Sequence, residues 1–158
     1  MPTTICLLAD RPELIGQIAA GYAAWSPAWY GQDGAGDARA DLEARARRGR
    51  IPVGLVAVDG DEAVGAAALA GESMSRGAEF GAWLVGLWVA PGHRRRGVGL
   101  GLIEAAVRQA ADLGVAELRA GTVAAAGLFE RAGWSRQEPI LHEGRITQVY
   151  AIRPDAAA

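Results

Sequence analysis

The feature that most constrains the fold is a long apolar segment followed at once by a turn rich in glycine and arginine. Residues 82–90 read AWLVGLWVA, and residues 91–102 read PGHRRRGVGLGL. A strand that is apolar on both of its faces belongs in the middle of a sheet that is covered on both sides. Pro91 ends this strand, and the spacing of the apolar residues after Gly97 predicts a helix. The segment therefore predicts a buried strand, a tight turn and a helix at the centre of the molecule.

The rest of the chain adds strands and helices before and after this segment. Apolar runs predict strands, and apolar residues at helical spacing predict helices. Before the segment, the pattern predicts a strand at 4–8, helices from 10 and over 37–48, and a hairpin of strands at 53–58 and 63–69. After it, the pattern predicts a helix from 97, a strand at 115–120, a helix at 123–132, and strands at 134–141 and 146–152. This order indicates a mixed α/β fold.

Two of these helices carry more detailed expectations. Asp10 and Glu13 have the spacing of a capping box, so the first helix is expected to begin at Asp10. The helix after Gly97 is expected to end at Gly114. Its buried side is expected to consist of the apolar residues Leu100, Ile103, Val107 and Ala110.

Charge and cysteine content argue against several classes of function. The formal net charge is −2, and all 16 basic residues are arginine, a bias expected of a G+C-rich bacterial genome. Such a balance gives no general attraction to nucleic acid or to an anionic membrane. The one cysteine, Cys6, excludes an intrachain disulfide, and neither His93 nor His142 has partners at metal-ligand spacing. With no signal peptide or long apolar span evident, we expect a cytoplasmic protein without a metal.

The turn before the predicted helix has the features of an anion-binding site. A helix start exposes unpaired N–H groups and the positive end of the helix dipole. Gly97 and Gly99 let the backbone approach a ligand closely, and three arginines stand beside them. These features suit a pyrophosphate, although a tight turn with solvated arginines would have the same sequence. The lack of lysine excludes a Walker loop, and Leu102 stands where a dinucleotide fingerprint needs its third glycine.

At this turn the sequence resembles the GNAT superfamily of N-acetyltransferases. Residues 94–99 (RRRGVG) match the R/Q-x-x-G-x-G/A acetyl-CoA signature, and residues 118–134 (LRAGTVAAAGLFERAGW) are similar to a later strand–helix segment of the family. The resemblance covers about residues 53–152. It implies one domain over 1–158, with an acceptor-shaping part at about 1–52 and an acetyl-CoA-binding part at about 53–152. It also implies a mostly antiparallel central sheet, splayed between its fourth and fifth strands, with helices on both faces.

The resemblance assigns residues to the coenzyme. It implies that acetyl-CoA is the cosubstrate and that main-chain groups of Leu87 and Val89 pair with its pantetheine arm. It implies that the N–H of Val89 stabilises the oxyanion formed when an amine attacks the thioester directly. Thr122 would offer a hydroxyl near the pantetheine. The turn would hold the pyrophosphate through the residues Arg94, Arg95, Arg96, Gly97, Val98 and Gly99.

The sequence departs from the family at the proton donor. Phe129 stands where the family has a tyrosine that protonates the leaving thiolate, and phenylalanine cannot donate a proton. We therefore expect slower transfer, with water or Tyr150 as a substitute donor. The residue that removes the proton of the amine is unassigned. Glu72 and Glu79 flank the loop before the central strand and could take this proton directly or through water, but each is equally a solvated loop residue.

The acceptor is expected to be a primary amine on a small molecule or a peptide. Trp25, Trp29 and Tyr30 lie in one aromatic loop that either lines an acceptor pocket or packs against the sheet. Family members are often dimers, so a homodimer is an open alternative. A non-catalytic acyl-CoA-binding module, favoured by Phe129, and a nucleotide-binding domain without coenzyme A are the rival functions.

Overall fold

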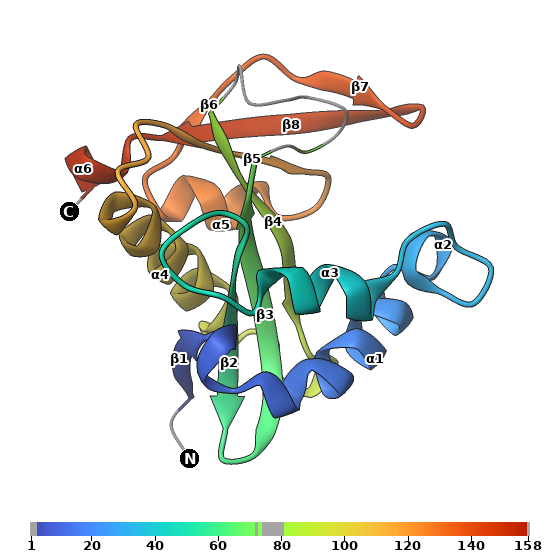
Figure 1. Cartoon of the computed structure of the whole chain (residues 1–158). Coiled ribbons are helices and arrows are strands. Elements are labelled where there is room, and N and C mark those ends of the chain that lie inside the picture. The colour runs from blue at the N-terminus through green and yellow to red at the C-terminus, as the bar shows by residue number, and fades with distance from the viewer. Residues whose placement is uncertain (1–2, 72, 74–80, 158) are drawn as a thin grey trace.

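A mixed sheet of eight strands organises the residues that the structure describes, which are 3–71, 73 and 81–157 of this computed structural model (Figure 1). The strands lie in the order β1-β2-β3-β4-β5-β8-β6, and β7 pairs with β8. They are β1 (Thr4–Leu7), β2 (Val53–Asp59), β3 (Glu62–Ala70), β4 (Ala82–Val89), β5 (Leu118–Thr122), β6 (Ser135–Arg136), β7 (Ile140–His142) and β8 (Arg145–Ile152). The α-helices are α1 (Ile15–Trp25), α2 (Pro27–Tyr30), α3 (Ala38–Arg45), α4 (Val98–Asp112), α5 (Ala126–Arg131) and α6 (Pro154–Ala157).

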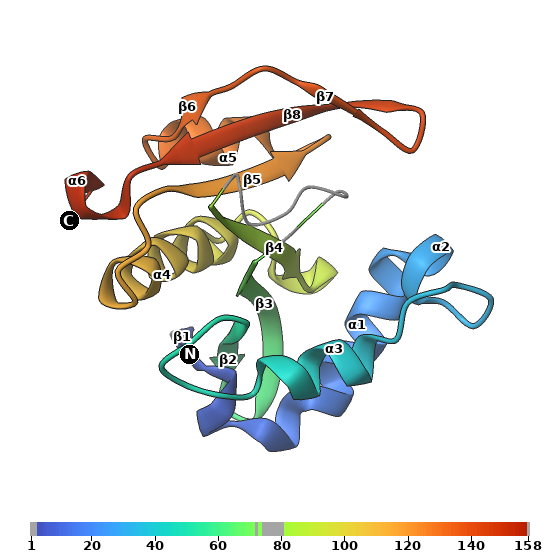
Figure 2. The same cartoon turned by 45° about the horizontal axis from the view of Figure 1, so that its top comes forward.

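Strands β4 and β5 start side by side and then separate. They run parallel and pair at two positions, Ala82 with Leu118 and Trp83 with Arg119. Beyond these pairs β4 follows its antiparallel partner β3, while β5 follows β8. Figure 2 shows β5 and β8 turning away from β4. The predicted splay between the fourth and fifth strands is confirmed.

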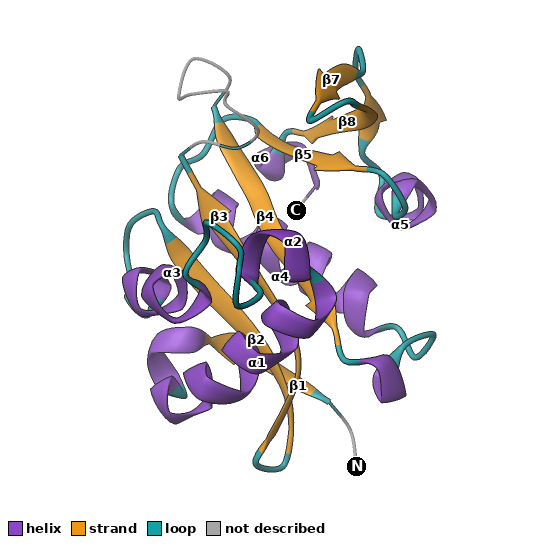
Figure 3. Ribbon diagram, turned by 90° about the vertical axis from the view of Figure 1, so that its right-hand side faces the viewer, coloured by secondary structure: helices purple, strands orange, loops and turns teal. Residues whose placement is uncertain are grey.

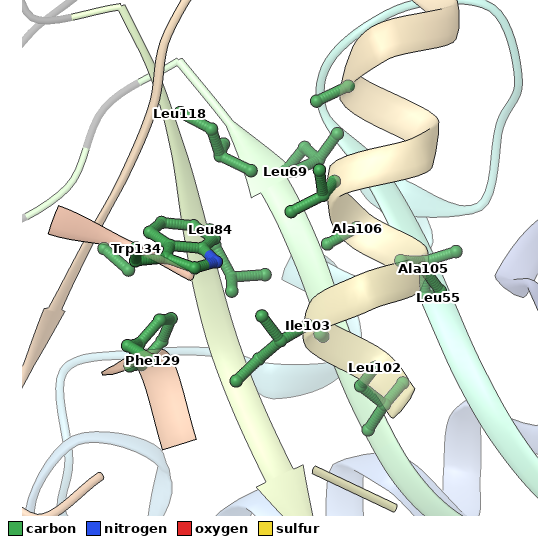
Figure 4. Close-up of a cluster of buried hydrophobic side chains, with 14 of the residues drawn as sticks. Leu55, Leu69, Leu84, Leu102, Ile103, Ala105, Ala106, Leu118, Phe129 and Trp134 are labelled. Atoms are coloured by element: carbon green, nitrogen blue, oxygen red, sulfur yellow. The ribbon is translucent and has the colours of Figure 1, made fainter. Parts of the chain in front are cut away.

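Helices cover the sheet on both faces. Helix α4 packs on β2, β3 and β4 from one side, and α1 and α3 lie on the other side (Figure 3). The core under α4 includes Leu102 and Ile103 (Figure 4), whereas Tyr22 and Trp88 belong to the core under α1 and α3. Both expected faces of β4 are therefore buried, as its apolar sequence predicts.

The buried side of α4 is broader than the expected one and excludes one expected residue, Leu100. It also includes Val98, Gly99, Leu102, Ala105 and Ala106. Leu102 is fully buried, because Gly65 of β3 leaves room for it: a Cβ on Gly65 would lie 3.0 Å from Leu102 Cδ1. Leu100 is only partly buried and faces a surface groove instead. The other three expected residues, Ile103, Val107 and Ala110, are buried.

The capping box predicted at the first helix is wrong. Residues Leu8–Asp10 and Pro12–Leu14 form two separate 3-10 turns, and α1 begins only at Ile15. The carboxylate of Asp10 accepts a hydrogen bond from Arg48, so it does not cap the helix. The carboxylate of Glu13 bonds Arg11 at 2.7 Å. The hydrogen bond from the distant Arg48, and a second 3-10 turn that begins at Pro12, replace the predicted cap.

Several other elements have different bounds from those expected. The strand predicted at 115–120 is β5 at Leu118–Thr122, and the helix predicted at 123–132 is the shorter α5 at Ala126–Arg131. The strand predicted at 134–141 is divided into β6 and β7, because Pro139 lies between them and has no N–H for a strand partner. The helix predicted over 37–48 ends at Arg45, and Asp37 caps its start by accepting from Ala40 N at 3.0 Å. The loop before it contains the short helix α2.

A bulge interrupts β4 halfway along. The register against β3 shifts between Ala66 and Ala68, and Gly86 has a φ of +62°, which favours glycine. Tyr22 of α1 donates a hydrogen bond to Gly86 O at 2.7 Å, and a Cβ on Gly86 would lie only 2.7 Å from the same hydroxyl. This hydrogen bond thus holds α1 against β4 at a position beyond the last residue of β4 that pairs with β5.

Across the described part of the chain, no helix combines the length and the apolar character that crossing a membrane requires.

Candidate functional site

Helix α4 begins with an open, left-handed turn. Gly97 precedes its first residue with a φ of +81°, no side chain caps this end, and Arg95 also has a positive φ of +63°. The first hydrogen bond of the helix runs from Gly101 N to Gly97 O (2.9 Å), so the N–H groups of Val98 and Gly99 precede it. A Cβ on Gly97 would meet no atom within 4 Å. The main chain of this turn is therefore exposed to a ligand.

A groove of about 750 Å³ lies beside this turn. Its walls come from the end of β4, the start of α4, the start of α5 and the end of α1. The described residues that line it are Trp25, Leu87, Val89, His93, Arg94, Arg95, Gly97, Val98, Gly99, Leu100, Ala124, Ala125, Leu128 and Arg131. The structure thus brings the predicted anion turn and the end of β4 into one groove, and Trp25 joins them from α1.

Main-chain groups of Val89 point into the space that β5 leaves. Ala90 N donates to Val64 O on β3 at 2.9 Å. Successive residues of an antiparallel pair direct their main-chain groups to alternate sides, so those of Val89 point away from β3. The carbonyl of Val89 accepts from Arg94 Nε at 3.1 Å, which fixes the arginine stem against the strand. The N–H of Val89 lies on the same side, facing the groove.

The three arginines of the turn do not act as one group. Arg94 and Arg95 line the groove, whereas Arg96 faces a separate hollow that Asp59 also lines. None of the three forms an ion pair with a carboxylate of the described residues. His93 stands at the rim, 3.3 Å from Glu62 Oε1 through its Nε2. The described residues contain no cluster of three or more histidine, cysteine, aspartate or glutamate side chains that could hold a metal ion.

The predicted residues Thr122, at the end of β5, and Phe129, on α5, do not line the groove. Thr122 Oγ1 accepts from Ala125 N at 2.7 Å and so closes the turn before the helix. Phe129 is 2% exposed and packs against Trp134 at 4.9 Å between ring centroids (Figure 4). Its ring also stacks with that of Tyr150 at 5.8 Å. The hydroxyl of Tyr150 donates to Glu130 Oε2 at 2.7 Å. Phe129 has no proton to donate and the hydroxyl of Tyr150 is engaged, so neither residue supplies a free proton donor to the groove.

Of the three expected acceptor aromatics, only Trp25 lines the groove, and it is 45% exposed. Trp29 packs edge-on against Tyr30 at 6.3 Å between ring centroids, with its indole over Gly36. Tyr22 contacts both Tyr30 and Trp25 and so joins these rings in one aromatic cluster. Tyr30 donates to Asp41 Oδ2 at 2.7 Å, and burial together with this bond raises the pKa of its hydroxyl. Glu72 and Glu79, the candidate bases, lie outside the described residues.

Sequence analysis missed the face that α5 turns to the groove. Leu128 and Arg131 both line it, and Leu128 Cδ1 lies 3.3 Å from the position that a Cβ on Gly99 would take. The signal was available, because residues three apart share one face of a helix.

Comparisons with known proteins agree on the family. The model of the acetyltransferase (GNAT) family matches residues 18–134, well over half of the chain. A search of curated protein sequences found no match. An N-acetyltransferase from Staphylococcus aureus Mu50 has a similar structure, with a TM-score of 0.76, 15% identity, and 98% of this chain and 99% of that chain covered.

Two further similar structures were solved with a coenzyme. An aminoglycoside 6'-N-acetyltransferase complexed with coenzyme A has a TM-score of 0.75 at 15% identity, covering 98% of this chain and 97% of its own. The protein yncA from Salmonella typhimurium, with acetyl-CoA, has a TM-score of 0.73 at 20% identity, covering 98% and 95%. Identities this low show a shared fold. The fold and the match of the family model together show that this chain belongs to the GNAT family of acetyltransferases.

Proposed function

We propose that the chain transfers the acetyl group of acetyl-CoA to a primary amine, by direct attack within a ternary complex. The observation that carries this proposal is the uncapped start of α4 at Gly97, open to a groove that leads to the separated end of β4. Membership of an acetyltransferase family and similar structures that contain coenzyme A or acetyl-CoA support it. On this proposal residues 1–52 shape the acceptor site and residues 53–152 bind the coenzyme.

The turn before α4 binds the pyrophosphate through its main chain. The N–H groups at the helix start and the positive end of the helix dipole attract an anion, and Gly97 leaves the approach open. Arg94 and Arg95 add charge from the walls of the groove. The main chain of Leu87 and Val89 pairs with the amides of the pantetheine arm, in the manner of an added strand.

The chemical step has three requirements: the amine must lose a proton, the carbonyl oxygen must be stabilised as it becomes negative, and the thiolate must leave. An alkylammonium with a pKa near ~10.4 must lose a proton to water in the groove before its nitrogen can attack the carbonyl carbon. As the C–N bond forms, the carbonyl oxygen gains negative charge, which the N–H of Val89 stabilises. The C–S bond then breaks and the thiolate leaves. A thiol pKa near ~8.5, judged from cysteine, makes this leaving group tolerable without a strong acid.

The proton donor is the weakest part of the proposed machinery. Phe129 is buried between aromatic rings, and the Tyr150 hydroxyl is engaged with Glu130. Water in the groove is therefore the proton source that we propose for the leaving thiolate. These same observations favour the second candidate function, a module that binds acyl-CoA without catalysing transfer.

Coenzyme binding and turnover can be measured separately. Acetyl-CoA and coenzyme A are expected to raise the melting temperature, whereas ATP is not. Release of free thiol from acetyl-CoA is then followed in the presence of a panel of amines. Turnover with any amine supports the transferase. Binding without turnover across the panel would favour the binding module, and stabilisation by ATP alone would contradict both.

A further inference from the structure

One tryptophan joins the coenzyme groove from the opposite face of the sheet. Trp25, the last residue of α1, lines the groove together with Leu87 and Val89 of β4. Of the described residues in this lining, Trp25 alone precedes β4 in the chain. Helix α1 lies on the face of the sheet opposite to α4 (Figure 3). Trp25 therefore reaches the groove past the edge of β4 from which β5 has separated.

Close packing of α1 against β4 determines where Trp25 lies. A Cβ on Gly21 would lie only 2.2 Å from Trp88 Cζ2, so the missing side chain lets the helix approach the strand. Trp25 follows Gly21 by one turn and lies on the same face of α1. Its ring packs against that of Tyr22 at 5.7 Å between centroids, and the Tyr22 hydroxyl donates to Gly86 O at 2.7 Å. Through Tyr22, the indole is thus held near the bulge of β4.

The bulge lies at the end of the groove that is farther from the turn before α4. Gly86 precedes Val89, the last residue of β4, by three residues, which corresponds to about 10 Å along a strand. The turn at Gly97 follows beyond Val89. We have proposed that the pyrophosphate binds at Gly97 and that the pantetheine arm follows β4 away from it. The thioester and its acyl group then lie nearest to Leu87 and Trp25.

The side chains at this end of the groove are apolar and supported from behind. Leu87 packs against the core under α4, and Trp25 rests on Tyr22, which is fully buried. Packed interiors resist displacement, so neither side chain can move aside without disturbing its support. A methyl group needs little space beyond the thioester, whereas every further CH2 group needs more. The indole of Trp25 occupies the space into which a longer acyl chain would extend.

We propose that Trp25 closes the acyl end of the groove and so restricts the coenzyme's acyl group to short chains, with acetyl preferred. This inference rests on the proposed coenzyme site and assigns the residue that sets the acyl chain length. A small residue in place of Trp25 opens apolar space beside Leu87. Each CH2 group buried in that space strengthens binding by up to about fourfold. The dependence of affinity on chain length therefore has opposite signs with and without the indole.

The test measures the binding of acetyl-CoA, butyryl-CoA and hexanoyl-CoA by calorimetry, with no amine present. Trp25→Ala is compared with the wild type, and Trp29→Ala is the matched control, because Trp29 is similarly exposed and is not among the described residues that line the groove. We expect the wild type and Trp29→Ala to bind hexanoyl-CoA about tenfold or more weakly than acetyl-CoA. Trp25→Ala should bind hexanoyl-CoA about tenfold or more tightly than acetyl-CoA. Trp25→Phe, which keeps a ring on Tyr22, should give an intermediate dependence on chain length.

Three outcomes would overturn the inference: equal binding of all three coenzymes by the wild type, an unchanged preference in Trp25→Ala, or the same change in Trp29→Ala. A Trp25→Ala variant that alters only the KM of the amine would also overturn it, because the indole would then belong to the acceptor site. Trp25→Phe tests the same point with the smallest loss of packing. A reversed preference without thiol release would support this inference and contradict the proposed transferase activity alone. Thiol release with an unchanged preference would do the opposite.

Discussion

Helices α4 and α5 both begin at the same groove, but they meet it in different ways. The start of α4 is uncapped, and Gly97 presents open main chain with no atom within 4 Å of its missing side chain. The turn before α5 is closed by the Thr122 hydroxyl, and Phe129 of α5 is packed into the core. We propose that the first helix start binds an anion, whereas the second contributes packing and no proton donor.

The difference teaches that binding and proton transfer depend on separate parts of the chain. Anion binding uses main-chain groups, which any residue carries and which glycine exposes. Proton donation needs a particular side chain in a particular place, and one substitution removes it. A member of this family can therefore keep its coenzyme groove while its rate of transfer changes.

The largest effect is expected at the start of α4. Gly97→Glu places a bulky anion where the pyrophosphate is proposed to bind, so coenzyme A affinity should fall roughly 100-fold or more. Gly114→Glu is the matched control, because Gly114 also has a positive φ (+75°) with nothing within 4 Å, at the other end of α4. Both variants should lose similar stability, about 1–2 kcal/mol for a left-handed residue. Unchanged affinity of Gly97→Glu for coenzyme A would show that the coenzyme binds elsewhere than at this turn.

A smaller effect is expected when a proton donor is restored. Phe129→Tyr should raise the rate of acetyl transfer by only about tenfold, below the 10² to 10⁴ that a general acid typically contributes, because the ring at this position is buried and does not line the groove. Its hydroxyl enters a buried aromatic cluster, so the melting temperature should fall. Pre-steady-state thiol release separates the chemical step from product release. An unchanged rate would show that the missing donor does not limit transfer.

The turn before α5 should respond more weakly. Thr122→Ala removes the hydroxyl that accepts from Ala125 N and should cost about 1 kcal/mol of unfolding free energy. Coenzyme affinity should decrease only a few-fold, since Ala124 and Ala125 line the groove but have no side-chain group that could bind the coenzyme. Thr122→Ser keeps the hydroxyl and should behave as the wild type in denaturant unfolding. A loss of affinity as large as that of Gly97→Glu would show that the two helix starts contribute equally to coenzyme binding and would contradict the contrast drawn between them.

The smallest effect on rate is expected at Tyr150. Its hydroxyl donates to Glu130, so Tyr150→Phe should leave the rate of acetyl transfer unchanged and lower stability by about 1 kcal/mol. Glu130→Gln, which alters the same hydrogen bond from its other end, is a suitable comparison. A rate that drops tenfold in Tyr150→Phe alone would identify this hydroxyl as the substitute donor after all.

The elements nearest the site were those that sequence predicted best. The apolar run of β4, Pro91 after it and Gly97 before α4 are local signals, and each one appears where it was expected. The failures involve partners far apart in the chain. Asp10 bonds Arg48, 38 residues further along the chain, instead of capping a helix.

The candidate site was predictable only in part, for the same reason. Glycine spacing indicated the anion turn, because it reflects backbone geometry that is set within a few residues. That Phe129 is buried and that Trp29 and Tyr30 turn away from the groove depend on packing between distant elements.

The central claim is that main-chain amides at the start of α4 hold the coenzyme. A titration of the ¹⁵N-labelled protein with coenzyme A, followed by amide chemical shifts, tests it directly on a chain of 16.4 kDa. We predict that the largest shifts occur at the amides of Gly97, Val98, Gly99 and Leu100, with Val89 next. Saturable shifts centred on other residues, or no shifts at all, would contradict the claim.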